Sequence, residues 1–238
     1  MRVKVLGCGE AFGAGGRFQT SFLVDLVGFR FLLDCGASSL IALRKHSIDP
    51  MSLDAVVVSH LHGDHFGGLP FLDRFYHAYS RPRPLLVWGP PLLRERFEAA
   101  LAALYPGSGR RYDLHMHSYA GDFEMGGARF RALPVDHDEL TNPHGLRIQA
   151  GGRLLAFSGD SAWTESLVDI SDESDVFICE CGLAEPGRPK HVALSQLRQQ
   201  RGRLKCGRLL LTHLGQEMLD LLPLPDFEVL EDGQEFSV

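Results

Sequence analysis

The 238-residue chain carries 24 lysines and arginines against 30 aspartates and glutamates, a formal net charge of −6. This negative charge argues against a protein that binds nucleic acid by neutralising many phosphates. The hydrophobic content of 45% and the charged content of 23% are ordinary for a globular protein. Because no linker or low-complexity tract interrupts the chain, we expect one domain spanning residues 1–238.

The cysteine content and the hydropathy pattern exclude several protein classes. Five cysteines at irregular spacing argue against a disulfide framework and a thiolate zinc finger. The apolar run at the N-terminus is too short for a secretory signal. No apolar stretch approaches the ~18 residues that span a membrane. We therefore expect a cytoplasmic protein with no membrane partner.

Apolar runs that predict strands alternate along the chain with patterns that predict helices. The predicted strands are residues 3–7, 21–27, 29–34, 55–59, 85–88, 146–150, 154–158, 176–181 and 209–212. The predicted helices are residues 38–46, 67–79 (with Pro70 in the first turn), 90–105 and 193–202. Several strands are apolar throughout, as strands covered on both faces are. The pattern predicts an α/β fold in which helices cover the sheets.

Four metal-capable side chains follow the predicted strand at residues 55–59: His60, His62, Asp64 and His65. His60 and His62 are two residues apart, and at a strand end such residues share one face. Gly63 permits a sharp turn, so Asp64 and His65 can point into the same loop. This mixture of nitrogen and oxygen ligands favours zinc, or else manganese or iron, over calcium and magnesium.

One loop cannot fill two coordination spheres, so further ligands are expected at other strand ends. His137, Asp160 and His213 each follow a strand-like run. Alone, each is better explained as an ordinary packed histidine or a turn aspartate. Together with the upstream loop they predict a metal site along one rim of a sheet. The histidines expected to lie outside this site are His46, His77, His115 and His117.

Taken in this order, these residues resemble the metallo-β-lactamase superfamily. The resemblance implies a four-layer αββα sandwich with a two-metal site at one edge. One divalent ion would then be held by His60, His62 and His137, and the other by Asp64, His65 and His213, with Asp160 bridging. Histidine at position 62 argues against the diiron branch, which carries glutamate there. Aspartate at position 160 departs from the cysteine of secreted zinc β-lactamases.

Two further stretches are similar to the ribonuclease Z branch. Residues 175–197 resemble a segment in which a strand-end glutamate, here Glu180, precedes a histidine, here His191. The glycine-rich residues 6–24 resemble the opening of that branch, with Cys8 where threonine or serine is commoner. Bacterial ribonuclease Z carries a tRNA-gripping arm between the residues matching His137 and Asp160, and here that interval is too short for one. The resemblance therefore implies a small phosphodiester substrate, as in cyclic ribose phosphodiesterase, and not a long tRNA.

The expected chemistry is hydrolysis of a small or cyclic phosphodiester or nucleotide by a metal-bridging hydroxide, since a pair of bound metals lowers the pKa of water to about 7. His191, oriented by Glu180, would donate a proton to the leaving alkoxide. Asp64 belongs to the same catalytic set. The alternative for Glu180 is that it only orients a ligand histidine.

Two other functions remain open on the sequence alone. The same metals could serve thioester or lactone hydrolysis of the glyoxalase II type, or the fold could be a non-catalytic scaffold. A non-catalytic scaffold would be expected to have lost some ligand residues, and here a suitable residue stands at every ligand position. The oligomeric state stays open, a homodimer included. Six aromatic residues could stack on a substrate ring or pack in the core: Phe12, Phe18, Phe66, Phe71, Trp88 and Trp163.

Overall fold

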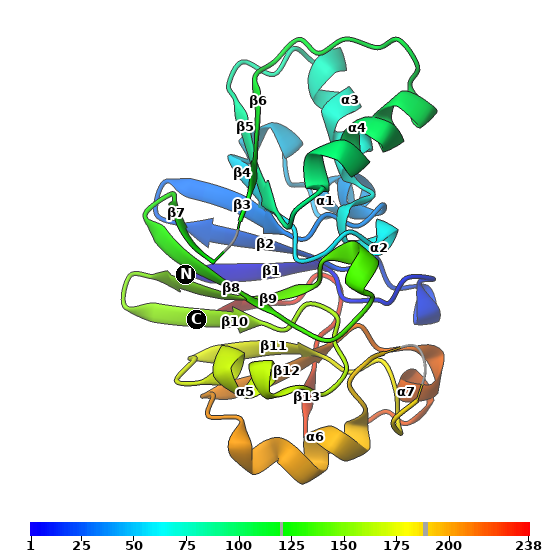
Figure 1. The fold of residues 1–238 in the computed structure, drawn as a ribbon, viewed down its shortest axis with the longest axis vertical. Coiled ribbons are helices and arrows are strands. Elements are labelled where there is room, and N and C mark those ends of the chain that lie inside the picture. Colours follow the sequence, from blue (N-terminus) through cyan, green and yellow to red (C-terminus); the bar gives the residue numbers. More distant parts are fainter. Residues whose placement is uncertain (120, 188–189) are drawn as a thin grey trace.

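The computed structural model describes residues 1–119, 121–187 and 190–238, and within them the strands form two mixed sheets that face each other (Figure 1). The first sheet has the order β14-β1-β2-β3-β4-β5-β6. Its strands are β1 (Arg2–Gly7), β2 (Ser21–Leu26), β3 (Phe29–Leu33), β4 (Ala55–Val57), β5 (Leu85–Gly89), β6 (Leu114–Ser118) and β14 (Glu235–Ser237).

The second sheet has the order β13-β12-β11-β10-β9-β8-β7. Its strands are β7 (Asp122–Met125), β8 (Ala128–Pro134), β9 (His144–Ala150), β10 (Arg153–Phe157), β11 (Val176–Glu180), β12 (Arg208–Thr212) and β13 (Glu228–Val229). Each sheet is antiparallel at one end and parallel at the other, with β3 to β6 parallel in the first and β10 to β13 in the second. In α/β proteins, ligands bind outside the carboxyl ends of parallel strands.

Helices cover the outer face of both sheets (Figure 1). The first sheet packs against α1 (Ser39–Lys45), α3 (Leu69–Ala78) and α4 (Leu93–Leu104), and the second against α5 (Glu165–Ser171), α6 (Leu194–Gln200) and α7 (Gln216–Asp220). The remaining short elements are α2 (Gly63–Phe66), η1 (Ala14–Gly16), η2 (Pro50–Ser52), η3 (Glu139–Thr141) and η4 (Arg201–Arg203).

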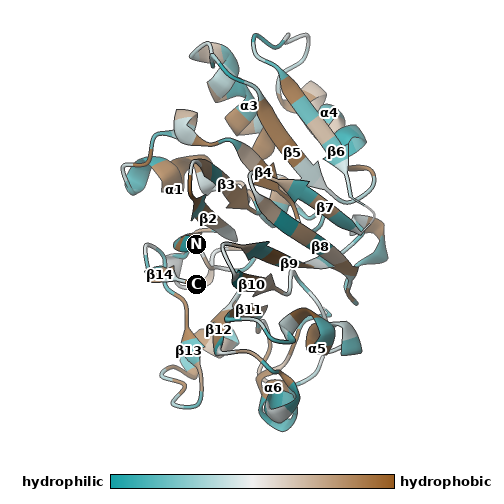
Figure 2. Cartoon of the chain, turned by 90° about the vertical axis from the view of Figure 1, so that its left-hand side faces the viewer, coloured by the Kyte–Doolittle hydropathy of each residue, from teal (hydrophilic) through white to brown (hydrophobic). Residues whose placement is uncertain are grey.

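Alternation along the strands divides the apolar side chains between three layers of core. On β3, Phe31 and Leu33 enter the core between the sheets, whereas Leu32 packs under the helices. On β11, Ile178 enters the core between the sheets and Phe177 packs under the helices. At these positions both strand faces are therefore buried, whereas β7 and β8 alternate between buried apolar and exposed polar side chains (Figure 2). This arrangement confirms the predicted αββα sandwich.

The predicted strands and helices are all present, with bounds that shift by a few residues, and Pro70 lies in the first turn of α3. One detail was wrong. The strand predicted at residues 55–59 ends at Val57, so His60 and His62 lie in a loop and not on a shared strand face. The ladder stops because the backbone N–H of Ser59 donates to the buried carboxylate of Asp34, at 2.6 Å, instead of to a neighbouring strand.

The chain between His137 and Asp160 is compact, as predicted. It contains η3 and the β9–β10 hairpin and has no room for a long substrate-gripping arm. All five cysteines are free, which agrees with the absence of a disulfide framework. None of the described helices combines the length and apolar character needed to cross a bilayer.

Candidate metal centre

The seven predicted ligands come together at the edge where the carboxyl ends of both sets of parallel strands meet. His60 follows β4, His137 follows β8, Asp160 follows β10 and His213 follows β12 directly. They form two sets, in each of which the candidate ligand atoms lie within 4.8 Å of one another. The outer triad is His60, His62 and His137, and the inner group is Asp64, His65, Asp160 and His213.

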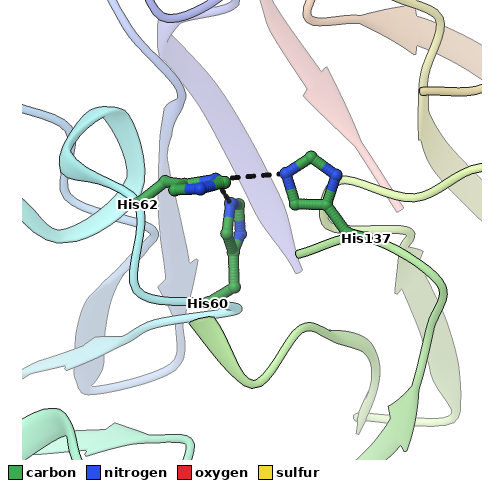
Figure 3. Close-up of side chains that lie close together, drawn as sticks. All are labelled: His60, His62 and His137. Carbon is green, nitrogen blue, oxygen red and sulfur yellow. Dashed lines mark hydrogen bonds between the residues drawn. The ribbon is translucent and has the colours of Figure 1, made fainter. Parts of the chain in front are cut away.

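The three rings of the outer triad converge on one point (Figure 3). Nδ1 of His62 lies 3.2 Å from Nε2 of His60 and 3.1 Å from Nε2 of His137. Two nitrogen ligands at 2.0–2.1 Å from a tetrahedral ion are separated by about 3.3 Å. The nitrogen spacing of the outer triad therefore fits a zinc-like ion.

Asp160 lies between the two sets. Within the inner group, its Oδ1 is 3.3 Å from Nε2 of His65 and its Oδ2 is 3.2 Å from Nε2 of His213. The same Oδ2 lies 3.8 Å from Nε2 of His60 and 4.0 Å from Nε2 of His137 in the outer triad. One carboxylate is therefore within reach of both sets, as a bridging ligand must be.

A glycine allows Asp160 to reach this position. Gly159 has a φ of +59°, a conformation that L-residues with a side chain rarely adopt. A Cβ atom at Gly159 would also lie 2.6 Å from the carbonyl oxygen of His144. The turn after β10 thus requires glycine just before the aspartate.

Buried partners fix the histidines of the inner group. The Nδ1 atom of His65 lies 2.7 Å from a carboxylate oxygen of Asp34, which also accepts hydrogen bonds from the backbone and hydroxyl of Ser59. The Nδ1 atom of His213 lies 3.1 Å from the hydroxyl of Thr20. Asp34 and Thr20 are both buried. With these nitrogens occupied, the Nε2 atoms are directed at the centre.

The outer triad has weaker support. His137 Nδ1 lies 2.8 Å from the carbonyl oxygen of Lys190, and His60 Nδ1 lies 3.1 Å from the hydroxyl of the preceding serine. Outside the triad, the partner of His62 among the described residues is the carboxylate of Asp138, at 3.5 Å, and the two side chains are 37% and 46% exposed. The outer triad is thus open to solvent at His62, whereas the inner group is closed.

The sequence analysis missed Asp34, Thr20 and Asp138. Asp34 directly follows the apolar strand β3, the same pattern that identified Asp160, so a signal was present. Thr20 and Asp138 carry no comparable signal. The backbone also marks Asp34 and His213, whose φ values of 60° and 59° are uncommon outside glycine. Such conformations concentrate at functional sites.

The carboxylates around His65 favour a positive charge at its ring. Burial by itself lowers the pKa of His65, but the carboxylates of Asp160, Asp64 and Asp34 outweigh it and raise that pKa well above its usual value. Its buried Nε2 makes no hydrogen bond with the described residues, although carboxylate oxygens of Asp64 and Asp160 lie 3.3 Å away. In the outer triad, burial holds the pKa of His60 well below its usual value, which keeps its ring neutral. Neutral imidazoles and ionised carboxylates are the forms that bind a divalent metal.

His191 and Glu180 form a pair beside the candidate metal ligands. Glu180 is fully buried at the end of β11, and its Oε1 lies 2.8 Å from Nδ1 of His191. Its carboxylate also accepts hydrogen bonds from the backbone N–H groups of Ser161, Gly182 and Val192. Burial lowers the pKa of His191, but Glu180 outweighs this and raises it to about 9. The pairing with Glu180 therefore favours the protonated form of His191.

A cavity of about 430 Å³ opens above both sets. This volume falls in the range of roughly 300–1,000 Å³ that is typical of small-ligand pockets. The cavity is lined by Glu10, Ala11, Phe12, His62, Gly63, Asp64, His137, Asp160, Gly182, Leu183, His191, His213 and Gly215. Five of the seven candidate ligands (His62, Asp64, His137, Asp160 and His213) thus line one small pocket together with His191.

Residues 1–225 match a family model described as anti-Pycsar protein Apyc1. The chain belongs to this Apyc1 family. The protein Rv1339 of Mycobacterium tuberculosis is 32% identical over 225 residues, which cover 90% of this chain and 81% of that protein. Ribonuclease Z of Methanothermobacter thermautotrophicus is 24% identical over an alignment of 270 residues, which covers 90% of this chain and 86% of that protein.

Solved structures agree with this placement. The short form of human tRNase Z superposes with a TM-score of 0.81 at 21% identity, covering 100% of this chain and 99% of that one. A diphosphatase of the PhnP family superposes with a TM-score of 0.80 at 20% identity, covering 100% of this chain and 97% of that one. At these identities the superpositions establish the fold. Together with the family match and the histidine–aspartate cluster, they place this Apyc1-family chain among the metal-dependent hydrolases of the metallo-β-lactamase superfamily, in its ribonuclease Z-like branch.

Proposed function

We propose that the protein is a dinuclear-metal-dependent phosphodiesterase that acts on a small or cyclic phosphodiester or nucleotide. The observation that carries the proposal is the position of Asp160, whose carboxylate is within 4.0 Å of histidine nitrogens in both sets. The outer triad would hold one divalent ion and the inner group the other. The donors suit zinc first, with manganese or iron as alternatives.

When bound, two divalent ions would stabilise charge on the phosphoryl oxygens and make a water molecule nucleophilic at neutral pH. The side chains of the protein would hold these ions in position. Asp64 borders the cavity with its Oδ2 3.3 Å from Nε2 of His65, so we place it both among the ligands and in the catalytic set. The buried partners of the inner group hold its side chains in place before the substrate arrives.

His191 is the proposed proton donor to the leaving alkoxide. Glu180 occupies its Nδ1 atom, which leaves Nε2 to carry a proton into the cavity that His191 lines. A ring nitrogen of His191 also lies within 4.8 Å of ligand atoms of His137 and Asp160, so the alternative is a further metal ligand. Substitution can separate these two roles.

The size of the site supports a small substrate. The cavity of about 430 Å³ and the short β9–β10 hairpin, which stands where a substrate-gripping arm would be, favour a small substrate over a long tRNA. A nucleotide or cyclic phosphodiester fits the range of ligands that such pockets take.

The metal-loaded protein should be assayed on bis-p-nitrophenyl phosphate, a glutathione thioester and a homoserine lactone. We expect kcat/KM on the phosphodiester to exceed both others by at least about 100-fold, equivalent to about 2.7 kcal/mol of transition-state stabilisation. Faster thioester or lactone turnover would favour a glyoxalase II-type hydrolase and overturn the proposal.

His191→Ala should lower kcat by about 10²- to 10⁴-fold, the usual contribution of a general acid. The metal content per chain, measured by mass spectrometry, should stay unchanged. His115→Ala is the matched control, because His115 is exposed on β6 and belongs to neither set. Loss of metal from His191→Ala would show that His191 is a ligand and not a proton donor.

A further inference from the structure

One wall of the cavity is a loop that apolar packing does not hold in place. The loop, residues 9–17, lies between β1 and β2, and its Glu10, Ala11 and Phe12 line the cavity. Residues 10–17, all within the described part of the chain, are exposed or half-buried. Segments with few buried apolar contacts open at a low cost in free energy unless other interactions hold them. The position of this wall therefore depends on polar contacts.

A carboxylate from the far end of the chain closes the base of this loop. Through Oδ1, Asp232 accepts a hydrogen bond of 3.0 Å from the backbone N–H of Cys8, and through Oδ2 one of 2.7 Å from that of Phe18. Beside them, the backbone N–H of Gly9 donates to the carbonyl oxygen of Phe18 at 2.7 Å. Hydrogen bonds to a charged acceptor are stronger than those between neutral groups. One side chain thus joins the chain that enters the loop to the chain that leaves it.

Asp232 is itself fixed to both sheets. The backbone N–H of Leu230 donates to the carbonyl oxygen of Leu211 on β12 at 2.9 Å, and that of Gly233 donates to the carbonyl oxygen of Val5 on β1 at 2.7 Å. The two ends of the chain lie side by side (Figure 2), because β14 pairs with β1. The base of the loop is therefore tied to the strands that also position the candidate metal ligands.

The contacts at the tip of the loop fix its shape more than its place. The carboxylate of Glu10 accepts hydrogen bonds of 2.9 Å from two backbone N–H groups of the same loop. The side-chain amide of Gln19 donates to the carbonyl oxygen of Ala11 at 2.8 Å. Gln19 directly follows Phe18, whose backbone Asp232 holds. A loop that is braced internally in this way can move as a unit when its base is released.

We infer that Asp232 is a positioning residue: its carboxylate holds residues 9–17 in place as a wall of the cavity and thereby sets how tightly the site binds its substrate. The inference rests on the proposed function. Asp232 lies beyond residues 1–225, which match the family model, and it lines neither the cavity nor the two ligand sets. It would therefore act through the loop. When only part of the molecules have the wall closed, the apparent dissociation constant rises in inverse proportion to that part.

The first test is the kinetics of metal-loaded Asp232→Ala on bis-p-nitrophenyl phosphate. KM should rise by about 5- to 50-fold, because two hydrogen bonds to a carboxylate no longer favour the closed wall. The value of kcat should change by less than about threefold, since bound substrate still meets an intact metal centre. Asp232→Asn keeps one acceptor oxygen, so its KM should lie between those of the wild type and Asp232→Ala.

Glu231→Ala is the matched control, because it removes the neighbouring negative charge from an exposed side chain. Its constants should equal those of the wild type. Arg17→Ala weakens the same anchor from the side of the loop, since the guanidinium of Arg17 donates to the carbonyl oxygen of Leu230 at 3.1 Å. It should raise KM by a smaller factor, and it tests the inference even if Asp232→Ala does not fold. A fall in kcat at constant KM, or an equal change in Glu231→Ala, would overturn the inference.

Hydrogen exchange distinguishes positioning of the loop from support of the whole fold. In metal-loaded Asp232→Ala, the peptide that contains residues 9–17 should exchange at least about tenfold faster than in the wild type. The peptides that contain residues 60–65 and 213, and the metal content per chain, should stay unchanged. Loss of metal or faster exchange throughout the chain would overturn the inference, as would faster exchange of the loop without a change in KM.

The same measurement separates this inference from the proposed function. If the wild type does not hydrolyse the phosphodiester but residues 9–17 open in Asp232→Ala, the proposed function fails and Asp232 remains the anchor of the loop. If the wild type is active and Asp232→Ala changes neither KM nor exchange of the loop, the positioning role fails and the phosphodiesterase stands.

Discussion

The outer triad and the inner group offer similar donors in different surroundings. Every member of the inner group is buried, and His65 and His213 are fixed by the buried side chains of Asp34 and Thr20. In the outer triad, His62 is 37% exposed, and its partner outside the triad among the described residues is the half-exposed carboxylate of Asp138. The comparison teaches that ligand identity and ligand support are separate properties. We expect the inner position to hold its ion tightly and the outer position to exchange it.

Asp160→Ala tests what the two positions share and should have the largest effect. Removing the carboxylate within reach of both sets should empty at least one position and lower kcat by about 10³-fold or more, because metal catalysis supplies several kcal/mol. Metal content per chain and turnover of bis-p-nitrophenyl phosphate measure the two effects. A variant that still holds two ions would count against a bridging role.

Stepwise removal of zinc tests the difference between the positions directly. Titration with a chromophoric chelator should release two ions in separate steps whose dissociation constants differ by about 10- to 100-fold, the usual influence of buried ligand partners. The outer ion should leave first. His62→Ala should remove only the weaker step, and a single step of two equivalent ions would contradict the comparison.

Asp34→Asn should reduce the difference between the positions. The substitution keeps the size of the side chain but removes the charge that pairs with His65 at 2.7 Å. We expect the affinity of the tight position to fall by about 10- to 100-fold while the weak position is unchanged. The same chelator titration measures it. Equal weakening of both steps would indicate a general loss of folding, which thermal unfolding of the metal-free protein would reveal.

Thr20→Val should have a smaller effect on the same position. It is close to isosteric and removes one uncharged contact, the hydroxyl 3.1 Å from Nδ1 of His213. A hydrogen bond of this kind contributes about 1 kcal/mol, so the tight dissociation constant should rise by about fivefold. An effect as large as that of Asp34→Asn would mean that charge is not what distinguishes the partners.

Asp138→Asn should have the smallest effect. It is the counterpart of Asp34→Asn in the outer triad, but Asp138 is 46% exposed and lies 3.5 Å from His62. Exposed ion pairs contribute at most about 1 kcal/mol, so the weak dissociation constant should change by less than about fivefold. A 10- to 100-fold change would show that exposure does not weaken the support of a ligand.

Local patterns were enough to find the ligand candidates and most of the fold. Apolar runs on both faces of strands predicted the covered sheets, and histidines or aspartates after such runs predicted the rim of the site. Asp34 follows the same rule and could have been identified in the same way. Thr20 could not, because nothing near it in the chain indicates that β12 will bring His213 to within 3.1 Å of its hydroxyl.

The residue types and their order along the chain therefore already specified an αββα hydrolase with seven candidate ligands and the Glu180–His191 pair. The packing of the two sheets decided the rest: which partner supports each histidine, and that Phe12, not another of the six aromatic candidates, lines the cavity. The reason is that these relations join residues up to 193 positions apart, as Thr20 and His213 are. Sequence periodicity reports only on neighbours within an element, whereas sheet pairing and burial determine distances between elements.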